Sequence, residues 1–231
     1  MSLRKLLFCC SVTLLAAGSC SDSATDSDDE SEPVGSGVPT EGLVARYSFS
    51  GNANDESANQ NHGTVYGASL VPDRYGRGDS AYFLDGVDDS ISFPRMRYAS
   101  GSEISVSLWV RLAAAPETRY FVMCSDFGVF QDFDSVGLAI SNPMTSNARG
   151  AVGYNVWHHF VGTYDGDTIK AYVNNSPVQA TRWPGYIADL NRHLLIGFFN
   201  NEFWRGSVDD IRIYNRALSP AAVDSLFREY H

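Results

Sequence analysis

The acidic pair Asp209-Asp210 is a main candidate in this sequence for residues that could do chemistry. It lies near the start of residues 206–219, where apolar and polar side chains alternate before a turn, a pattern that predicts a β-strand. Aspartate is disfavoured in strands, so something must compensate the pair. The residues leave three alternatives open: a turn, a salt bridge or a metal ion.

A second oxygen-rich stretch lies near the start of the folded part. Asp55, Asn59 and Asn61 share a loop that consists almost entirely of turn-forming residues. Carboxylate and amide oxygens are ligands that Ca²⁺ prefers, at roughly six to eight oxygens per ion. The same residues also suit an Asx-turn, in which the Asp side chain bonds to nearby backbone, so the sequence leaves both uses open.

Histidine and cysteine form no catalytic or metal-binding constellation in the sequence. His158 and His159 are adjacent, so in a strand they point to opposite faces and cannot chelate one ion together. A core or cross-strand contact is their expected role. Cys124 stands alone in an apolar run of the folded part, which predicts a small buried side chain and no disulfide.

Aromatic side chains outside the regular strand patterns are the candidates for sugar binding. Carbohydrate sites use flat aromatic faces beside a few polar groups, and Trp183 and Tyr186 are therefore the predicted ligand-binding residues. Trp109 and Trp157 lie in regular strand patterns and are expected in the core.

The first 41 residues predict export and anchoring rather than a fold. Residues 1–19 combine a basic start, an apolar run and small residues before Cys20, which is typical of a signal peptide. The segment resembles a bacterial lipobox in which Ala17 replaces the usual Leu, so Cys20 is the predicted lipidation site; an ordinary secretion signal is the alternative. Residues 20–41 contain many acids and no Lys or Arg, and they predict a disordered acidic tether.

The predicted location follows from these segments. We expect an outer-membrane lipoprotein of the bacterial cell envelope that touches the membrane through its lipid anchor only; exposure at the cell surface is left open. The chain has a net charge of −10 and no basic stripe, which argues against a nucleic-acid partner.

Residues 42–231 read as one all-β domain. Short strand patterns are separated by turn signals, and the clearest alternation runs from Ile104 to Leu112. Only residues 220–229 predict a helix, with Ser219 as N-cap and Pro220 at its first position. This pattern predicts a two-sheet antiparallel jelly-roll sandwich with one short C-terminal helix.

Several segments give the domain a more specific resemblance. It is similar to bacterial laminin-G-like domains of the concanavalin A-like lectin/glucanase superfamily. The matching segments follow the family's order and are residues 42–49, 54–63, 83–89, 104–110, 157–166 and 206–219.

The resemblance implies a structural calcium ion as the one expected cofactor. In such jelly rolls a calcium ion joins the N-terminal region to an Asp of the last strand, and Asp209 is the matching position. The implied ligands are Asp209 with Asp55, Asn59 and Asn61. The alternative is that Asp55 forms an Asx-turn with these Asn residues and that Asp209 pairs with an Arg.

The resemblance also bears on catalysis. Glycanases of this superfamily carry carboxylates at alternate positions of one strand, and residues 42–231 contain no such run. We therefore expect no enzyme but a binding or adhesion module that recognises a glycan or a protein partner. A glycan-active enzyme of the same fold and a structural surface-assembly subunit are the alternatives.

Overall fold

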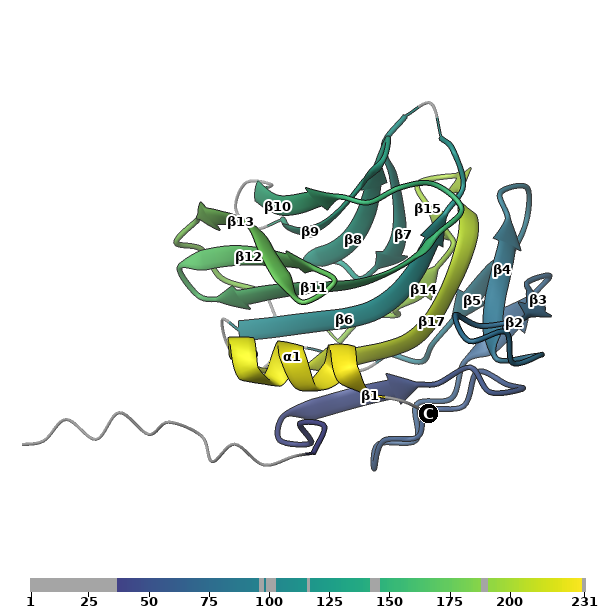
Figure 1. Ribbon diagram of the computed structural model, residues 1–231, viewed down its shortest axis with the longest axis horizontal. Coiled ribbons are helices and arrows are strands. Elements are labelled where there is room, and N and C mark those ends of the chain that lie inside the picture. Colours follow the sequence, from purple (N-terminus) through teal and green to yellow (C-terminus); the bar gives the residue numbers. More distant parts are fainter. Residues whose placement is uncertain are drawn as a thin grey trace, which may run out of the picture. The chain divides into compact units, whose positions relative to one another are not determined.

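The computed structural model describes residues 37–95, 98, 103–115, 117–141, 146–187 and 191–229. These residues form two large antiparallel sheets and one C-terminal helix, which confirms the predicted jelly-roll sandwich (Figure 1). Among the described residues, no helix has the length and apolar character that crossing a membrane requires.

The larger sheet has eight strands. Their order is β13-β12-β11-β6-β17-β4-β3, and β1 also pairs with β17. The bounds are β1 (Leu43–Tyr47), β3 (Ser69–Val71), β4 (Ala81–Asp85), β6 (Glu103–Leu112), β11 (Trp157–Asp165), β12 (Thr168–Val173), β13 (Ser176–Arg182) and β17 (Arg205–Tyr214).

The second sheet has seven strands in the order β10-β9-β8-β7-β14-β5-β2. The bounds are β2 (Thr64–Tyr66), β5 (Ser90–Ser92), β7 (Arg119–Met123), β8 (Phe127–Asp132), β9 (Ser135–Ile140), β10 (Ser146–Ala151) and β14 (Leu195–Ile196). The strands β15 (Phe198–Phe199) and β16 (Glu202–Phe203) form a small separate hairpin.

The main core lies between the two large sheets. The alternating apolar residues of β6, from Ile104 to Leu112, are at most 1% exposed and belong to this core, as predicted. Cys124 is also buried there, which confirms its predicted environment, and burial raises the pKa of its thiol to about 11.

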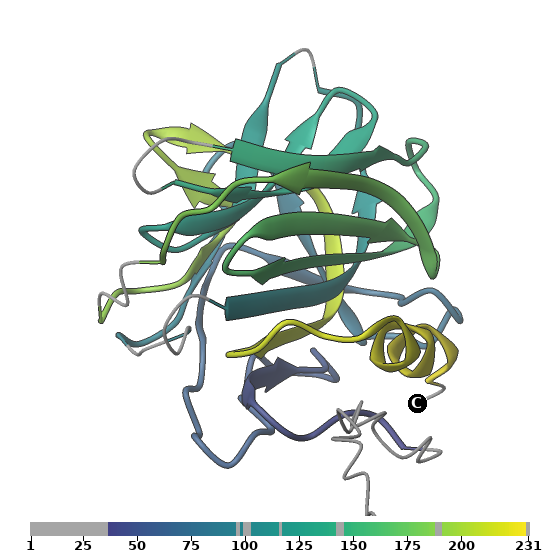
Figure 2. The same ribbon diagram turned by 90° about the vertical axis from the view of Figure 1, so that its left-hand side faces the viewer.

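The helix α1 (Pro220–Arg228) lies on the other face of the eight-stranded sheet. Figure 1 places it on the side of β6 and β17 that faces away from β7 to β10, and in Figure 2 it lies below the green strands of the eight-stranded sheet. Ser219 caps it by accepting a hydrogen bond from the amide of Ala222, as predicted. Its buried Val223 and Leu226 form a second apolar cluster with β11, β12 and β17 residues. We call the face that carries α1 the outer face.

The strand β17 joins the parts of the eight-stranded sheet. On one edge it pairs with β6, and on the other it pairs first with β4 and then with β1. The pairing with β6 shifts register between Asp209 and Arg212, and Asp210 has a φ of 47°. These are the features of a β-bulge, and the acidic pair forms it.

The described chain begins before residue 42. The Tyr214 hydroxyl donates a hydrogen bond to the Pro39 carbonyl, and Glu41 pairs with Arg216. Val38 packs against the cluster under α1. The last residues of the predicted tether segment therefore contact the domain.

Candidate functional site

A row of four side chains crosses the outer face of the eight-stranded sheet. Phe83 of β4 pairs with Ser207 of β17, which in turn pairs with Arg111 of β6. Arg111 also pairs with Trp157 of β11. Directly paired residues of antiparallel strands point to the same face. Neighbouring strands lie about 4.8 Å apart, so the three steps give a row of about 14 Å with an aromatic ring at each end.

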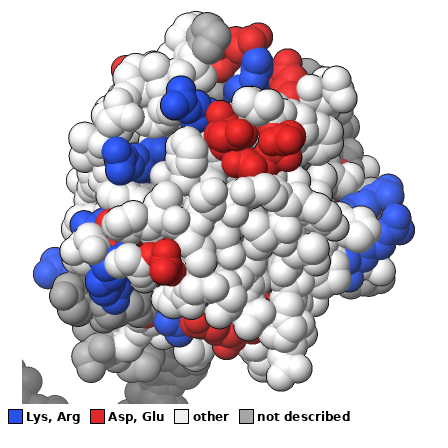
Figure 3. Space-filling view, turned by 90° about the vertical axis from the view of Figure 1, so that its right-hand side faces the viewer, with Lys and Arg blue, Asp and Glu red and all other residues white. Residues whose placement is uncertain are grey.

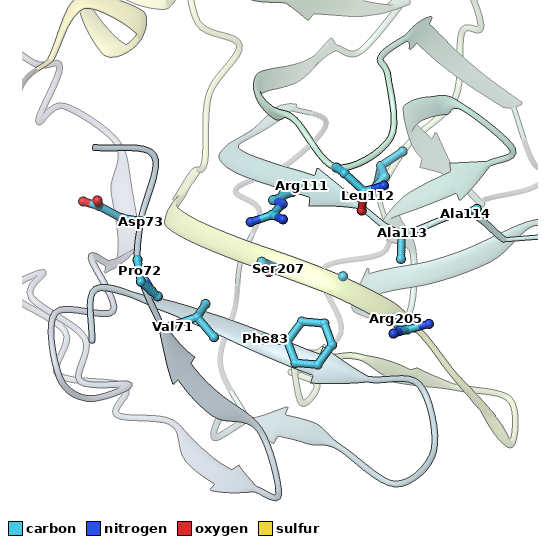
Figure 4. A pocket seen from close by; sticks show the side chains of 12 residues that line it. Val71, Pro72, Asp73, Phe83, Arg111, Leu112, Ala113, Ala114, Arg205 and Ser207 are labelled. Carbon is cyan, nitrogen blue, oxygen red and sulfur yellow. The ribbon is translucent and has the colours of Figure 1, made fainter. Parts of the chain in front are cut away.

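A cavity of about 630 Å³ opens over one end of this row. Figure 4 shows Arg111 and Phe83 on either side of β17, with Arg205 farther along that strand. Arg111 and Arg205 are exposed, and Phe83 is half-buried. The lining residues are Val71, Pro72, Asp73, Phe83, Arg111, Leu112, Ala113, Ala114, Asn155, Arg205, Gly206 and Ser207.

A second cavity, of about 590 Å³, shares Asn155 with the first. Tyr75 and Val156 on its rim are 41% and 57% exposed, so it presents apolar surface to solvent. The lining residues are Arg74, Tyr75, Trp109, Asn155, Val156, Trp157 and Phe227. We call the two cavities together the outer groove.

Trp109 and Trp157 lie in the outer groove and not in the core, so that expectation was wrong. The core residues of β6 are the even-numbered ones, and Trp109 therefore points to the outer face. Trp157 shares this face through its pairing with Arg111. An aromatic residue in a strand suits either face, and only the register decides which one it takes.

Two loops build the walls of the groove. Residues 72–77 are held by buried Asp73, whose carboxylate accepts hydrogen bonds from the amides of Tyr75 and Arg77 and pairs with the Arg77 side chain. Burial opposes ionisation of Asp73, but these bonds outweigh it and lower its pKa. On the opposite wall, the Asn155 amide donates to the Leu112 carbonyl at 2.8 Å. Both loops are thereby fixed to the ends of strands.

The guanidinium of Arg74 lies under the groove and binds both carboxylates of the acidic pair. Its Nη1 atom is 3.1 Å from Asp209 and 2.5 Å from Asp210. The three side chains are at most 5% exposed. The β-bulge lets two adjacent residues reach one cation, which a regular strand would not allow. Burial and the neighbouring Asp210 raise the pKa of Asp209.

Arg74 also stacks on two aromatic rings of the groove. Its guanidinium carbon lies 4.5 Å from the centroid of Trp109 and 4.6 Å from that of Tyr75. A cation over an aromatic face is attracted by the ring quadrupole. The acidic pair therefore fixes Arg74, and Arg74 in turn holds the aromatic floor of the second cavity.

His159 is buried beside this network. Its Nε2 atom shares a hydrogen bond of 2.9 Å with the Ser107 hydroxyl, and its ring packs against Trp109 and Phe227. Burial, together with Arg212 and Arg74, lowers its pKa to about 3. His159 therefore stays neutral, and the predicted core or cross-strand role is confirmed.

The predicted calcium ligands have other partners in this arrangement. The Asp55 carboxylate accepts hydrogen bonds from the amides of Arg46, Ser57 and Asn61, and from the Asn61 side chain. Asn59 donates its side-chain amide to the Val44 carbonyl. Burial opposes ionisation of Asp55, yet its backbone hydrogen bonds lower its pKa.

These contacts do not fit a calcium ion shared by Asp55 and Asp209. Each Asp55 oxygen already accepts two N–H groups, and Asp209 faces a guanidinium. The calcium site stays a prediction. A calcium-dependent rise in melting temperature that Asp209→Asn removes would support it, and identical melts with calcium and with chelator would count against it.

The sequence-predicted sugar-binding residues lie outside the linings of the two cavities. Trp183 is partly buried against the core, and its ring contacts Tyr164 at a centroid distance of 5.5 Å. Tyr186 is 53% exposed. A ligand role for these two residues stays a prediction, as does lipidation of Cys20, which lies outside the described residues.

An acidic group in the β4–β5 turn was not anticipated as a metal candidate. Acidic side chains form a compact patch on the face shown in Figure 3. In the β4–β5 turn, oxygens of Asp85, Asp88 and Asp89 lie within 4.8 Å of one another. The turn closes through hydrogen bonds from the Asp85 amide to Asp89 and from the Val87 amide to Asp85. Burial and the two neighbouring carboxylates raise the pKa of Asp89.

The family follows from a match to the chain itself. Residues 85–224 match the model of a laminin-G family described as the concanavalin A-like lectin/glucanases superfamily. Since the match covers more than half of the chain, the protein belongs to this superfamily. Comparison with curated protein sequences gave no match.

Solved structures share the fold at low sequence identity. One is domain 4 of AbnA, a GH43 extracellular arabinanase from Geobacillus stearothermophilus, in complex with arabinotriose. It is 22% identical with a TM-score of 0.62, and the match covers 80% of this chain and 98% of that domain.

Receptor-binding domains of bacterial toxins are also similar. A botulinum neurotoxin type C structure, described by the dependence of the toxin's cell entry on interaction with two ganglioside molecules, is 12% identical with a TM-score of 0.67. The match covers 82% of this chain and 52% of that one. A botulinum neurotoxin DC binding domain in complex with SialylT has 12% identity and a TM-score of 0.63, over 80% and 51% of the two chains. The chain thus spans about half the length of these toxin domains.

Proposed function

We propose that this protein is a non-catalytic carbohydrate-binding module that holds a glycan in the outer groove. The observation that carries the proposal is the lining of the groove. Aromatic rings of Phe83, Trp109, Trp157 and Tyr75 lie along it, beside the polar side chain of Asn155. Flat aromatic surface with a few fixed polar groups is the composition that sugar rings bind.

The neighbouring structures support the same class of ligand. The arabinanase domain is described in complex with arabinotriose, and the botulinum neurotoxin DC binding domain in complex with SialylT. Cell entry of botulinum neurotoxin type C is described as dependent upon interaction with two ganglioside molecules. At these identities the similarity shows the fold alone, so the position of the site rests on the residues of this chain.

The lining favours binding over hydrolysis. Glycoside hydrolysis uses a pair of carboxyl groups roughly 5–10 Å apart on either side of the scissile bond. Among the described residues that line the two cavities, Asp73 has the one carboxylate, and its oxygens bind two amides and Arg77. Asp73 is thus committed to holding its loop.

We also propose that the module is presented by a lipid anchor at Cys20, on the acidic tether of residues 20–41, in a bacterial envelope. The support is the order of basic start, apolar run, small residues and Cys in the sequence. A tethered module reaches glycans near the membrane without a spanning helix. Metabolic labelling with a palmitate analogue tests this, because Cys20→Ser should abolish the label.

A glycan array first identifies a glycan that the protein binds. Isothermal titration calorimetry with that glycan then tests the proposed site. Trp157→Ala should weaken binding about tenfold or more, because truncating an aromatic side chain that anchors a ligand costs roughly 2 kcal/mol and about 1.4 kcal/mol is tenfold in affinity. Tyr66→Ala is the matched control, since Tyr66 is 54% exposed on the other sheet and outside the groove. Equal weakening by the two variants, or by neither, would contradict the proposed site.

A further inference from the structure

Two arginines of the outer groove have no carboxylate partner among the residues that the structure describes. Most of the described Lys and Arg side chains lie within 4 Å of a carboxylate oxygen. Among the described residues, the cations without such a contact are Arg95, Arg111, Arg192 and Arg205. Arg111 and Arg205 line the same cavity. Two positive charges therefore share one opening in a chain whose net charge is −10.

We propose that the outer groove selects glycans that carry a carboxylate or sulfate group, and that Arg111 and Arg205 bind this group. This inference rests on the proposed carbohydrate-binding function and names the class of glycan. Both substituents present oxygens that match the guanidinium fork, and charge-assisted hydrogen bonds to such groups are stronger than neutral ones.

The strand register places Arg111 where a sugar would pass. It occupies the middle of the cross-strand row, between Phe83 and Trp157. A ring stacked on either aromatic side chain would bring its substituents toward the guanidinium. Arg205 approaches the same cavity from the first position of β17, farther along the strand (Figure 4).

Two carboxylates beside this cavity have other partners. The Asp73 carboxylate pairs with Arg77, and in Figure 4 it points away from Arg111. Asp85 is the cross-strand neighbour of Arg205, but its carboxylate accepts hydrogen bonds from the amides of Val87 and Asp88. An anionic ligand would thus bring the missing counter-charge to the cavity and relieve the repulsion of the two guanidinium groups.

The test is a glycan array with three sets, probed with the full chain: oligogalacturonates for carboxylates, sulfated galactan (carrageenan) oligosaccharides for sulfates without carboxylates, and methyl-esterified oligogalacturonates as neutral counterparts of the first set. We expect binding to at least one anionic set and at least tenfold weaker binding to the neutral set. Since a charge-assisted hydrogen bond contributes roughly 1.5–3 kcal/mol, Arg111→Gln and Arg205→Gln should each weaken anionic binding about tenfold or more.

Matched variants separate the selectivity from the function. Arg182→Gln removes a charge from a side chain that is 76% exposed on β13, outside the groove, and should leave binding unchanged. Preference for neutral glycans, with Trp157→Ala still reducing their binding, would overturn the anionic selectivity and keep the carbohydrate-binding function. Binding that no groove variant reduces, or no binding to any set, would overturn both.

Discussion

The outer face of the eight-stranded sheet contains two regions that differ in how their arginine side chains are paired and buried. At the second cavity, the cation of Arg74 is buried and bound by Asp209 and Asp210. In the first cavity, Arg111 and Arg205 are exposed, and no carboxylate of the described residues lies within 4 Å of them. The two regions are built on the same strands, β6 and β17.

This contrast indicates that the buried arginine stabilises the fold and that the exposed arginines serve another role. A buried cation must be paired, because an unpaired charge in the interior costs several kcal/mol, so the Arg74 network is part of the fold. An exposed cation costs little in water, so Arg111 and Arg205 need not contribute to stability. Their charge is available for a ligand.

Loss of Arg74 should have the largest effect on stability. Arg74→Leu removes the cation that both buried carboxylates bind, and breaking a buried ion pair costs roughly 3–5 kcal/mol. The free energy of unfolding from urea titration measures the loss. A loss below about 1 kcal/mol would mean that the two regions do not differ as described.

Truncation of the helix should come next. Leu226 is 1% exposed in the cluster between α1 and the sheet, so Leu226→Ala should cost about 3 kcal/mol in the same titration. Val223→Ala is a milder companion in the same cluster and should cost less. If neither variant changes the unfolding midpoint, α1 does not stabilise this face.

The pH dependence of stability should reveal the buried His159. Its pKa of about 3 in the folded protein lies below the usual value of 6.5, so the unfolded state binds more protons between these values. The contribution of His159 to the free energy of unfolding should therefore rise from about pH 3 to about pH 6.5, with a slope of at most about 1.4 kcal/mol per pH unit. Above about pH 6.5 it should stay constant.

A variant isolates this contribution. The raised pKa of Asp209 acts in the opposite direction, because the folded state then binds more protons and this contribution falls as the pH rises above the unfolded value. Wild type and His159→Gln share the contribution of Asp209, so it cancels in the difference between their free energies of unfolding. If that difference is flat from pH 3 to 6.5, His159 does not titrate as described.

The groove arginines should have the smallest effect on stability. Arg111→Gln and Arg205→Gln should change the free energy of unfolding by no more than about 0.5 kcal/mol, since both side chains are exposed. Thermal melts measure this, and Arg182→Gln is the surface control. Destabilisation comparable to that of Arg74→Leu would make them structural residues and remove the contrast.

The sequence predicted the parts of the fold that depend on local pattern. The alternation from Ile104 to Leu112 predicted the core face of β6, and Ser219-Pro220 predicted the start of α1. Both signals act within a few residues, so they need no knowledge of the partner strand.

The site could not be predicted in the same way, because it depends on the register between strands that are distant in the sequence. No local pattern of residues determines that register. Phe83, Arg111, Trp157 and Ser207 form one row because β4, β6, β11 and β17 are neighbours, although they lie far apart in the chain. The sequence indicated that the acidic pair needs a compensating partner, but that partner, Arg74, lies 135 residues before Asp209. Within β6, Trp109 among the otherwise polar odd-numbered positions was a local signal that this second face is also covered.

The central claim is that a glycan binds in the outer groove, and the tryptophans report on it directly. The chain has 4 tryptophans: Trp109 and Trp157 line the groove, Trp183 packs against the edge of the core, and Trp204 is 1% exposed. Nuclear magnetic resonance resolves their indole N–H signals during titration with a bound glycan. We predict that the signals of Trp109 and Trp157 shift while that of Trp204 does not. A shift confined to Trp183 would contradict the account and place the ligand at the Trp183–Tyr186 loop.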